Sequence, residues 1–286
     1  MKISSTIILT LIQFLAFGQP NEWDIESIKK NKVKEVRIVF DVPKTNPEHP
    51  FMLWRQASFD RQGRVSESNC KHCLYQSHRP EGSFADLIQK YTYDNGRLVK
   101  IEEIGFDKSV VSIAYDTLRN RILETIVDDK GQRTSLEIKY LNESGRKILS
   151  WKIEFGGAYE FDDSVAQVFF DKTEWQYNKK ESFTQIYNSD ELVNMGSQIR
   201  KSDFLVLQTS FDIQEIEIII KKTDLSFLKP WSRVRTEKNK DKIFEHNVER
   251  KTGTTYFLGK NGLIEKEEKP IADKLKTFIY QYSYYN

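Results

Sequence analysis

Apolar and polar side chains alternate along most of this chain from Lys32 onward, and helical periodicities are few. Alternation with a period of two places one apolar and one polar face on each strand, as in an antiparallel sheet. The clearest runs are residues 36–40, 136–140 and 151–155. The pattern predicts a mostly β fold, an antiparallel up-and-down meander of hairpins that forms a large curved or partly closed sheet with one or two short helices.

A turn phrase recurs between the predicted strands. In its best copies an aromatic residue and an Asp precede the turn, and Gly, Arg and an apolar residue follow. Asn95-Gly96 fits a two-residue type I′ turn, and Arg61-Gln62-Gly63 fits a three-residue loop with a left-handed Gly. Asn120 takes the Gly position in another copy, since Asn tolerates positive φ. The copies lie at residues 59–65, 93–98, 115–121, 127–132, 140–146 and 256–264.

These phrases resemble the YD repeats of Rhs-type and teneurin-type proteins, whose consensus runs Tyr-Asp-x-x-Gly-Arg-Leu. The resemblance covers residues 55–155 and, more weakly, 250–268. It implies a β-meander in a small exported protein of a Gram-negative bacterium. The copies are too few to form the large enclosing shell of that family, so the shell function is not carried over.

Other segments are assigned from their local patterns. Residues 24–30 and 189–200 are predicted to be short helices, and residues 156–187 and 203–222 to be strands. Residues 233–241 are predicted to form a solvated loop. The final run, from Phe278 to Asn286, puts alternating aromatic residues on one face. This feature resembles the closing strand of outer-membrane barrels, but the charge of the rest of the chain favours a core-packing strand.

The N-terminus has the features of a secretory signal peptide. Lys2 gives a positive start, residues 7–17 are apolar, and small residues precede a cleavage point between Gly18 and Gln19. We therefore expect a signal peptide at residues 1–18 and an exported mature chain that is periplasmic or extracellular. No Pro-, Gly- or Ser-rich linker divides residues 19–286, which predicts a single β-rich domain with a soft division near 156–190.

Composition limits the function classes. The chain has 286 residues and a formal net charge of +2, with 38% hydrophobic and 30% charged residues. A nearly neutral balance gives no reason to expect nucleic-acid binding, which needs clustered positive charge. No later run reaches the roughly 18 apolar residues of a membrane helix, so we expect no transmembrane helix in the mature chain.

Cys70-Lys71-His72-Cys73 is the compact chemical cluster of the sequence. In an oxidising compartment two thiols usually form a disulfide, so we expect Cys70 and Cys73 to be bridged. Zinc or copper binding is a second interpretation, in which His72, His78 or His49 would add ligands. Thiol–disulfide exchange and uninvolved thiols are the other two.

Motifs of common enzymes are missing from the sequence. It has no Gly-x-Ser-x-Gly elbow, no phosphate-binding Gly loop and no His-Glu-x-x-His. Adjacent carboxylates such as Glu102-Glu103 face opposite sides of a strand, so they cannot flank one substrate bond. Asp128-Asp129 is explained by its turn, and Asp162 is the most site-like carboxylate.

The leading hypothesis is therefore a non-enzymatic exported protein, binding or structural, whose partner is another envelope protein or a glycan. The first alternative is a small metal-binding or thiol-redox protein centred on Cys70 and Cys73, with zinc as the candidate cofactor. The second alternative is a β-sheet enzyme that acts on glycans or peptides. No catalytic residue is assigned.

Overall fold

In the computed structural model, the described part of the chain forms short helices and long strands. Described are residues 25–41, 51–76, 83–155, 165–178, 181–188, 197–226, 228–239, 241–248, 251–271 and 274–286. In chain order they form α2 (Ile25–Lys30), β1 (Val33–Asp41), β2 (Phe51–Phe59), β3 (Val65–Gln76), β4 (Ser83–Asp94), β5 (Arg97–Ile104), β6 (Lys108–Asp116), β7 (Arg121–Asp128), β8 (Arg133–Leu141), β9 (Lys147–Glu154), β10 (Val165–Tyr177), β11 (Glu181–Asn188), β12 (Ser197–Arg200), α3 (Lys201–Thr209), α4 (Ile213–Lys222), β13 (Lys229–Lys238), β14 (Lys242–Asn247), β15 (Thr252–Leu258), β16 (Ile264–Ile271) and β17 (Lys274–Tyr284). The predicted signal peptide and its cleavage point at Gly18 and Gln19 lie outside the described residues.

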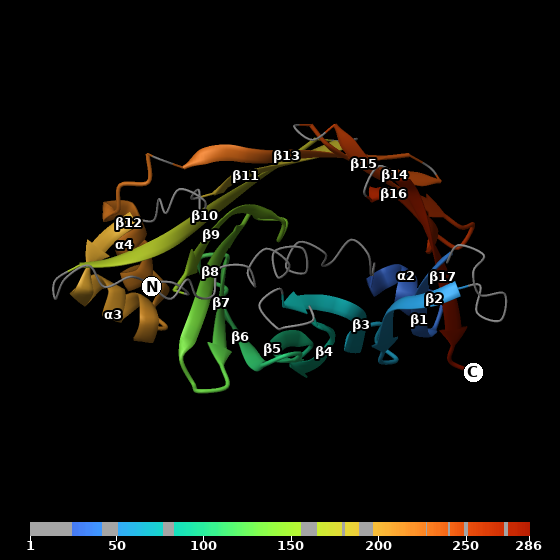
Figure 1. Cartoon of the computed structure of the whole chain (residues 1–286), viewed down its shortest axis with the longest axis horizontal. Coiled ribbons are helices and arrows are strands. Elements are labelled where there is room, and N and C mark those ends of the chain that lie inside the picture. The colour runs from blue at the N-terminus through green and yellow to red at the C-terminus, as the bar shows by residue number, and fades with distance from the viewer. Residues whose placement is uncertain are drawn as a thin grey trace.

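Sixteen of these strands pair into a closed antiparallel ring. β1 through β11 follow one another as a meander, β11 pairs with β13, and the meander continues to β17. β17 then pairs with β1, from Phe278↔Phe40 to Tyr284↔Val33. β12 stands outside the ring and pairs with the first residues of β10. Figure 1 shows the strands following one another around this ring.

The antiparallel meander that the alternation predicts is confirmed. The predicted sheet was curved or only partly closed, whereas the observed sheet closes completely into a barrel. Closure joins the first and last strands, which lie about 240 residues apart in the sequence. Local alternation sets the two faces of each strand, but carries no information about such a distant pairing.

The residues of the turn phrase supply the hydrogen bonds and the positive φ values of a tight hairpin turn. In the β2–β3 turn, the Asp60 Oδ1 accepts hydrogen bonds from the backbone N–H groups of Gln62 and Arg64, both at 2.9 Å. Gly63 donates its N–H to the Asp60 carbonyl and has a φ of 79°. Asp128 and Asn142 accept the same pair of bonds in their own turns. Asn95-Gly96 has positive φ at both residues, as a type I′ turn requires.

The resemblance to YD-repeat proteins is wrong. Any hairpin that needs an acceptor at its first turn residue and a left-handed residue at its end selects Asp or Asn and then Gly. The phrases in this chain serve that local need, and the strands they join close into a barrel instead of a spiral of repeats.

Two segments between β11 and β13 also differ from their predictions. Residues 203–222, predicted as strand, form the helices α3 and α4, and residues 197–200, predicted as helix, form β12. In α4 the buried residues are Ile213, Ile216, Ile219 and Ile220, a helical spacing that the local alternation of Glu and Ile concealed. Asp212 caps this helix by accepting a bond from the Gln214 N–H at 2.8 Å.

The predicted loop at residues 233–241 is largely a strand. β13 reaches Lys238, and the exposed Arg233 and Arg235 alternate with the less exposed Val234 and Thr236. Charges on one face of a strand produced a run that looked solvated in sequence. The short helix predicted at residues 24–30 is confirmed as α2 from Ile25.

Two hydrophobic clusters lie on opposite sides of the wall. The first gathers around α2 and β17, and Phe278 and Tyr280 are almost fully buried in it, as the prediction of a core-packing final strand requires. The second lies between the α3–α4 pair and strands β7 to β10, and includes Leu136, Ile138 and Ile216, each 0% exposed. In Figure 1, α2 lies within the ring, whereas α3 and α4 lie outside it.

Candidate functional site

The strand register assigns every ring position to the inner or the outer face of the barrel. Val36 faces α2, and the cross-strand pairs lead from it through Ala57 around the ring and back to Tyr282. Because cross-strand partners share a face, this series of pairs defines the inner wall. Residues that alternate with it, such as Leu136 and Ile138 beneath α4, define the outer wall.

Much of the inner wall is apolar and aromatic. Phe40, Trp54 and Phe278 form a triangle whose ring centroids are each 5.9 Å apart. Further along the wall, inward-facing apolar side chains are only partly buried, so part of their surface remains accessible. These are Ile101, Tyr115, Ile122, Ile126, Val234, Ile243 and Tyr256.

The inner wall of β7 to β9 carries a cluster of charged side chains. The Lys139 Nζ lies 2.5 Å from the Glu124 carboxylate and 3.3 Å from that of Glu137, and Lys152 forms an ion pair with Glu154. Burial alone would raise the pKa of the Glu137 carboxyl, but the ammonium groups of Lys139 and Lys147 outweigh it and leave that pKa below its ordinary value. We call Glu124, Glu137, Lys139, Lys147, Lys152 and Glu154 the inner ionic cluster.

The outer wall is charged over most of the ring. Oppositely charged side chains pair along its strands, as Lys100–Glu102 and Lys172–Glu174 do at 2.6 Å. Outer aromatic rings are covered by cations, for example Phe257, whose ring centroid lies 4.0 Å from the Lys266 Nζ. Charged and cation-covered surface of this kind is suited to contact with water.

The apolar outer face of β7 to β10 is covered by the chain's own helices. Beneath α3 and α4, the apolar faces of β7 to β10 are packed out of contact with solvent. The buried Arg121 forms an ion pair of 2.6 Å with Glu217, which holds α4 to the wall, and a second pair of 2.6 Å with Asp116 on β6. Arg133 donates hydrogen bonds to the Leu207 carbonyl, at 2.8 Å, and to that of Ser210, at 2.7 Å.

Arginine and tyrosine stack along the rim that carries the tight turns. The Arg64 guanidinium lies 4.7 Å from the ring centroid of Tyr93, and that of Arg97 lies 5.3 Å from the centroid of Tyr115. Each Arg follows one turn and stacks on a Tyr that precedes the next turn on the same rim. Arg146 over Tyr177 and Arg61 over Tyr285 add two further stacks. This contact gives the Tyr and the Arg of the turn phrase a structural role.

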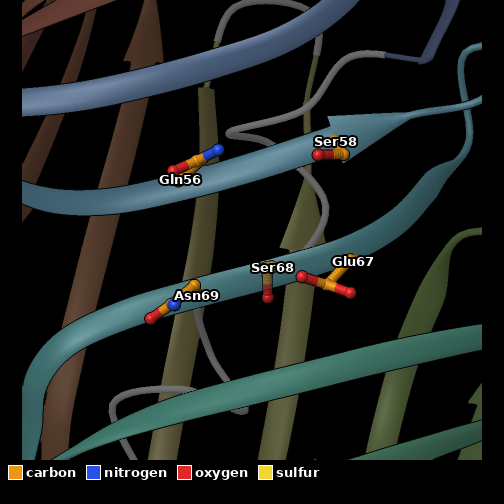
Figure 2. A pocket seen from close by; sticks show the side chains of 5 residues that line it. All are labelled: Gln56, Ser58, Glu67, Ser68 and Asn69. Atoms are coloured by element: carbon orange, nitrogen blue, oxygen red, sulfur yellow. The ribbon is translucent and has the colours of Figure 1, made fainter.

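A shallow polar hollow lies on the outer wall across β2 and β3 (Figure 2). Its lining includes Gln56, whose amide donates to the Glu35 carboxylate at 2.7 Å, and Asn69, whose buried Oδ1 has no hydrogen-bond partner among the described residues. The other lining residues are Ser58, Glu67 and Ser68. The hollow is small, and the outer wall continues around it.

The predicted cysteine cluster falls largely outside the described side chains. Cys70 lies on β3 and is 5% exposed. The side chains of His72 and Cys73, like His49 and His78, lie outside the part of the chain that can be described. Among the described residues no group of three metal-ligating side chains occurs. The disulfide, the zinc site and the redox site therefore stay predictions.

The carboxylate pairs that the sequence marked are separated by the strand geometry. Glu102 pairs with Lys100 on the outer wall, whereas Glu103 accepts bonds from Gln89 at 2.7 Å and Ser109 at 2.9 Å on the inner wall. The prediction that adjacent carboxylates face opposite sides is confirmed for this pair. Asp128 is engaged in its turn, and Asp162 lies outside the described residues.

The inner ionic cluster was not singled out from the sequence. Glu137-Ile138-Lys139 and Lys152-Ile153-Glu154 show the alternation plainly, but a polar face on a strand is ordinarily taken as the solvent face. Here α3 and α4 cover the apolar outer face of β8 and β9, so the polar face of these strands is directed into the barrel. Among the described helices, none has the length and apolar character needed to cross a membrane.

Comparisons with known proteins find structural neighbours but no matching sequence. No protein family model and no characterised protein sequence matches the chain. Among the solved structures that are similar in outline are two porin-like proteins. A porin-like protein from Bacteroides uniformis ATCC 8492 is 8% identical, with a TM-score of 0.32 over 88% of this chain and 97% of that one. A porin-like protein from Bacteroides vulgatus ATCC 8482 is 9% identical, with a TM-score of 0.33 over 88% and 98%.

Proposed function

We propose that this protein is an exported envelope component whose barrel works in water and binds an amphipathic ligand against its inner wall. The observation that carries the proposal is the polarity of the two walls. The outer wall carries ion pairs at separate points around the ring, and the inner wall combines apolar side chains with an ionic cluster.

The outer wall supports operation in water. A barrel that spans a membrane presents an apolar band about 25 Å tall to the lipid, and each Lys or Arg near the bilayer midplane costs about 2–4 kcal/mol. On this barrel, Lys100, Lys172 and Arg235 with their carboxylate partners face outward at successive points around the ring. Charged side chains on such a wall are well solvated in water and energetically unfavourable in lipid.

The inner wall supports an amphipathic ligand. Barrels with more than about eight strands are wide enough to enclose ligands or channels. Partly buried apolar residues such as Ile101, Ile126 and Tyr256 can gain stability when an apolar chain covers them, at about 25 cal/mol per Å² of apolar surface buried. The inner ionic cluster on β7 to β9 offers polar partners to the other end of the same ligand.

The first experiment concerns the mature chain, purified from the exported fraction without detergent. We expect an intact mass that begins at Gln19 and lies two hydrogens below the reduced value, as the predicted disulfide requires. We expect a native mass that exceeds the denatured mass by a bound lipid-sized molecule, recoverable in an organic extract. A protein that stays with the membrane fraction and needs detergent contradicts the proposal.

Matched isoleucine variants test the binding face. Ile126 faces inward and Ile104 faces outward, and both are partly buried. For Ile126→Glu we expect binding of a fluorescent apolar probe to fall by about tenfold, since a carboxylate would enter the apolar wall. For Ile104→Glu we expect no change. Equal effects of the two variants count against an inner binding wall.

A further inference from the structure

The inner ionic cluster contains cations that differ in their pairing. Lys139 contacts two carboxylates, at 2.5 Å and 3.3 Å, and Lys152 is paired with Glu154. Lys147 belongs to the same cluster, because its cross-strand partner Leu141 shares a face of β8 with Lys139. Its ammonium group also lowers the pKa of Glu137. No described residue forms an ion pair with Lys147.

The position of Lys147 is at the entrance of the cluster. It is the first residue of β9, directly after the tight turn at residues 142–146, and it pairs with Leu141 on β8. Lys139 and Ser150 form the next inward pair of the same two strands. Lys147 therefore lies between the rim of the barrel and the paired charges deeper on the wall.

The surroundings of Lys147 are unfavourable for an isolated cation. Burial lowers the pKa of its ammonium group, and the neighbouring charge of Lys139 lowers it further, although Glu137 and Glu124 act in the opposite direction. The nearby carboxylates already have partners in Lys139. An added anion would form the ion pair with the Lys147 ammonium group that no described residue of the cluster forms.

We propose that Lys147 binds the anionic headgroup of the amphipathic ligand, a carboxylate or a phosphate, while the apolar inner wall binds its chain. This inference rests on the proposed function and specifies its ligand as an anionic amphiphile. The ammonium group supplies the charge-assisted hydrogen bond, and the partly buried site strengthens that bond relative to water. The ligand lies with its head near the turn rim and its chain along the wall.

The test uses the mature chain and three probes, dodecanoate, dodecanol and acetate, measured by calorimetry in detergent-free buffer. We expect dodecanoate to bind about tenfold more tightly than dodecanol, which is the scale of one charge-assisted bond, and acetate not to bind. In Lys147→Met we expect this difference to vanish while dodecanol affinity is unchanged. Lys147→Arg should keep the preference, and Lys100→Met, on the outer wall, should behave as the unaltered protein.

The outcomes separate the two proposals. If dodecanol binds but dodecanoate has no advantage, or if Lys147→Met keeps the advantage, the assignment of Lys147 is overturned and the inner binding wall stands. If neither twelve-carbon probe binds, the proposed function fails and the headgroup assignment fails with it. If acetate binds as tightly as dodecanoate, the site is a simple anion site, and the amphiphile proposal is overturned.

Discussion

At the scale of single residues, the recurring turn phrase combines two contacts. In the turns at Asp60, Asp128 and Asn142, the side-chain oxygen accepts two backbone N–H groups. Between turns an Arg stacks on the next Tyr. The first contact is local and can be read from the sequence through the Asp-x-x-Gly spacing. The second joins neighbouring hairpins, so the sequence shows its residues but not their partners.

Asp128 and Asp129 are adjacent carboxylates with different roles, which allows a matched test. The Asp128 Oδ1 accepts bonds from the N–H groups of Lys130, at 3.0 Å, and Gln132, at 2.8 Å, whereas Asp129 is exposed. We expect Asp128→Ala to lower the free energy of unfolding by about 1 kcal/mol. Asp129→Ala should change it by less than about 0.5 kcal/mol. Urea denaturation measures both, and equal losses would contradict the turn assignment.

Tyr93 gives a prediction about alkaline pH. Burial, with smaller effects of Tyr91 and Asp60, raises its pKa to about 12. A raised tyrosine pKa stabilises the fold below the ordinary value near 10, and that stability is lost as pH rises from there through about 12. Tyr93→Phe should therefore lose less stability than the unaltered protein between pH 10 and 12. Absorbance titration at alkaline pH should show one fewer late-ionising tyrosine, and identical titration curves would contradict the assignment.

At the scale of elements, α4 shows how local alternation can mislead. Glu215 to Ile218 alternates in the manner of a strand, and in a strand Ile216 and Ile218 would share a face. In the helix, the side chain of Ile216 is fully buried and that of Ile218 is 48% exposed. The helical period becomes visible when Ile213 and Ile220 are included, since apolar residues then recur at three- and four-residue intervals.

The two isoleucines of α4 test the helix directly. We expect Ile216→Ala to cost about 2–4 kcal/mol of unfolding free energy, because a buried side chain leaves a cavity between α4 and the wall. Ile218→Ala should cost less than about 0.5 kcal/mol. Thermal and urea unfolding of both variants provide the measurement. Similar losses at both positions would favour a strand and refute the helix.

At the scale of the whole molecule, the defining feature is the closure of the sheet by the pairing of β1 with β17. In the ring, Arg37 of β1 lies opposite Gln56 of β2 on one side and Gln281 of β17 on the other. All three face outward, so cysteines placed there are accessible to oxidation. An open sheet with β1 at its edge would give β1 one of these neighbours, not both.

Engineered disulfides test this closure. With Cys70 and Cys73 replaced by Ser, we expect both Arg37→Cys/Gln56→Cys and Arg37→Cys/Gln281→Cys to form a bond on mild oxidation, since directly opposed strand residues have suitable Cα separations. The control Arg37→Cys/Thr277→Cys is displaced along β17 and should stay reduced. Bond formation is read from intact mass and non-reducing gels. Failure of the Gln281 pair alone would show that the ring is open.

The meander, the positions of most strands and turns, α2, and the separation of polar from apolar faces could be predicted from local sequence. These follow from contacts between residues close in the chain, namely strand alternation, turn hydrogen bonds and positive φ at Gly63 and Asn120. The tertiary structure decided which face is inside. On β8 and β9 the helices α3 and α4 cover the apolar face from outside, and this directs Glu137 and Lys139 inward. It also decided closure, because the pairing of Val33 with Tyr284 depends on the summed twist and stagger of every strand between them.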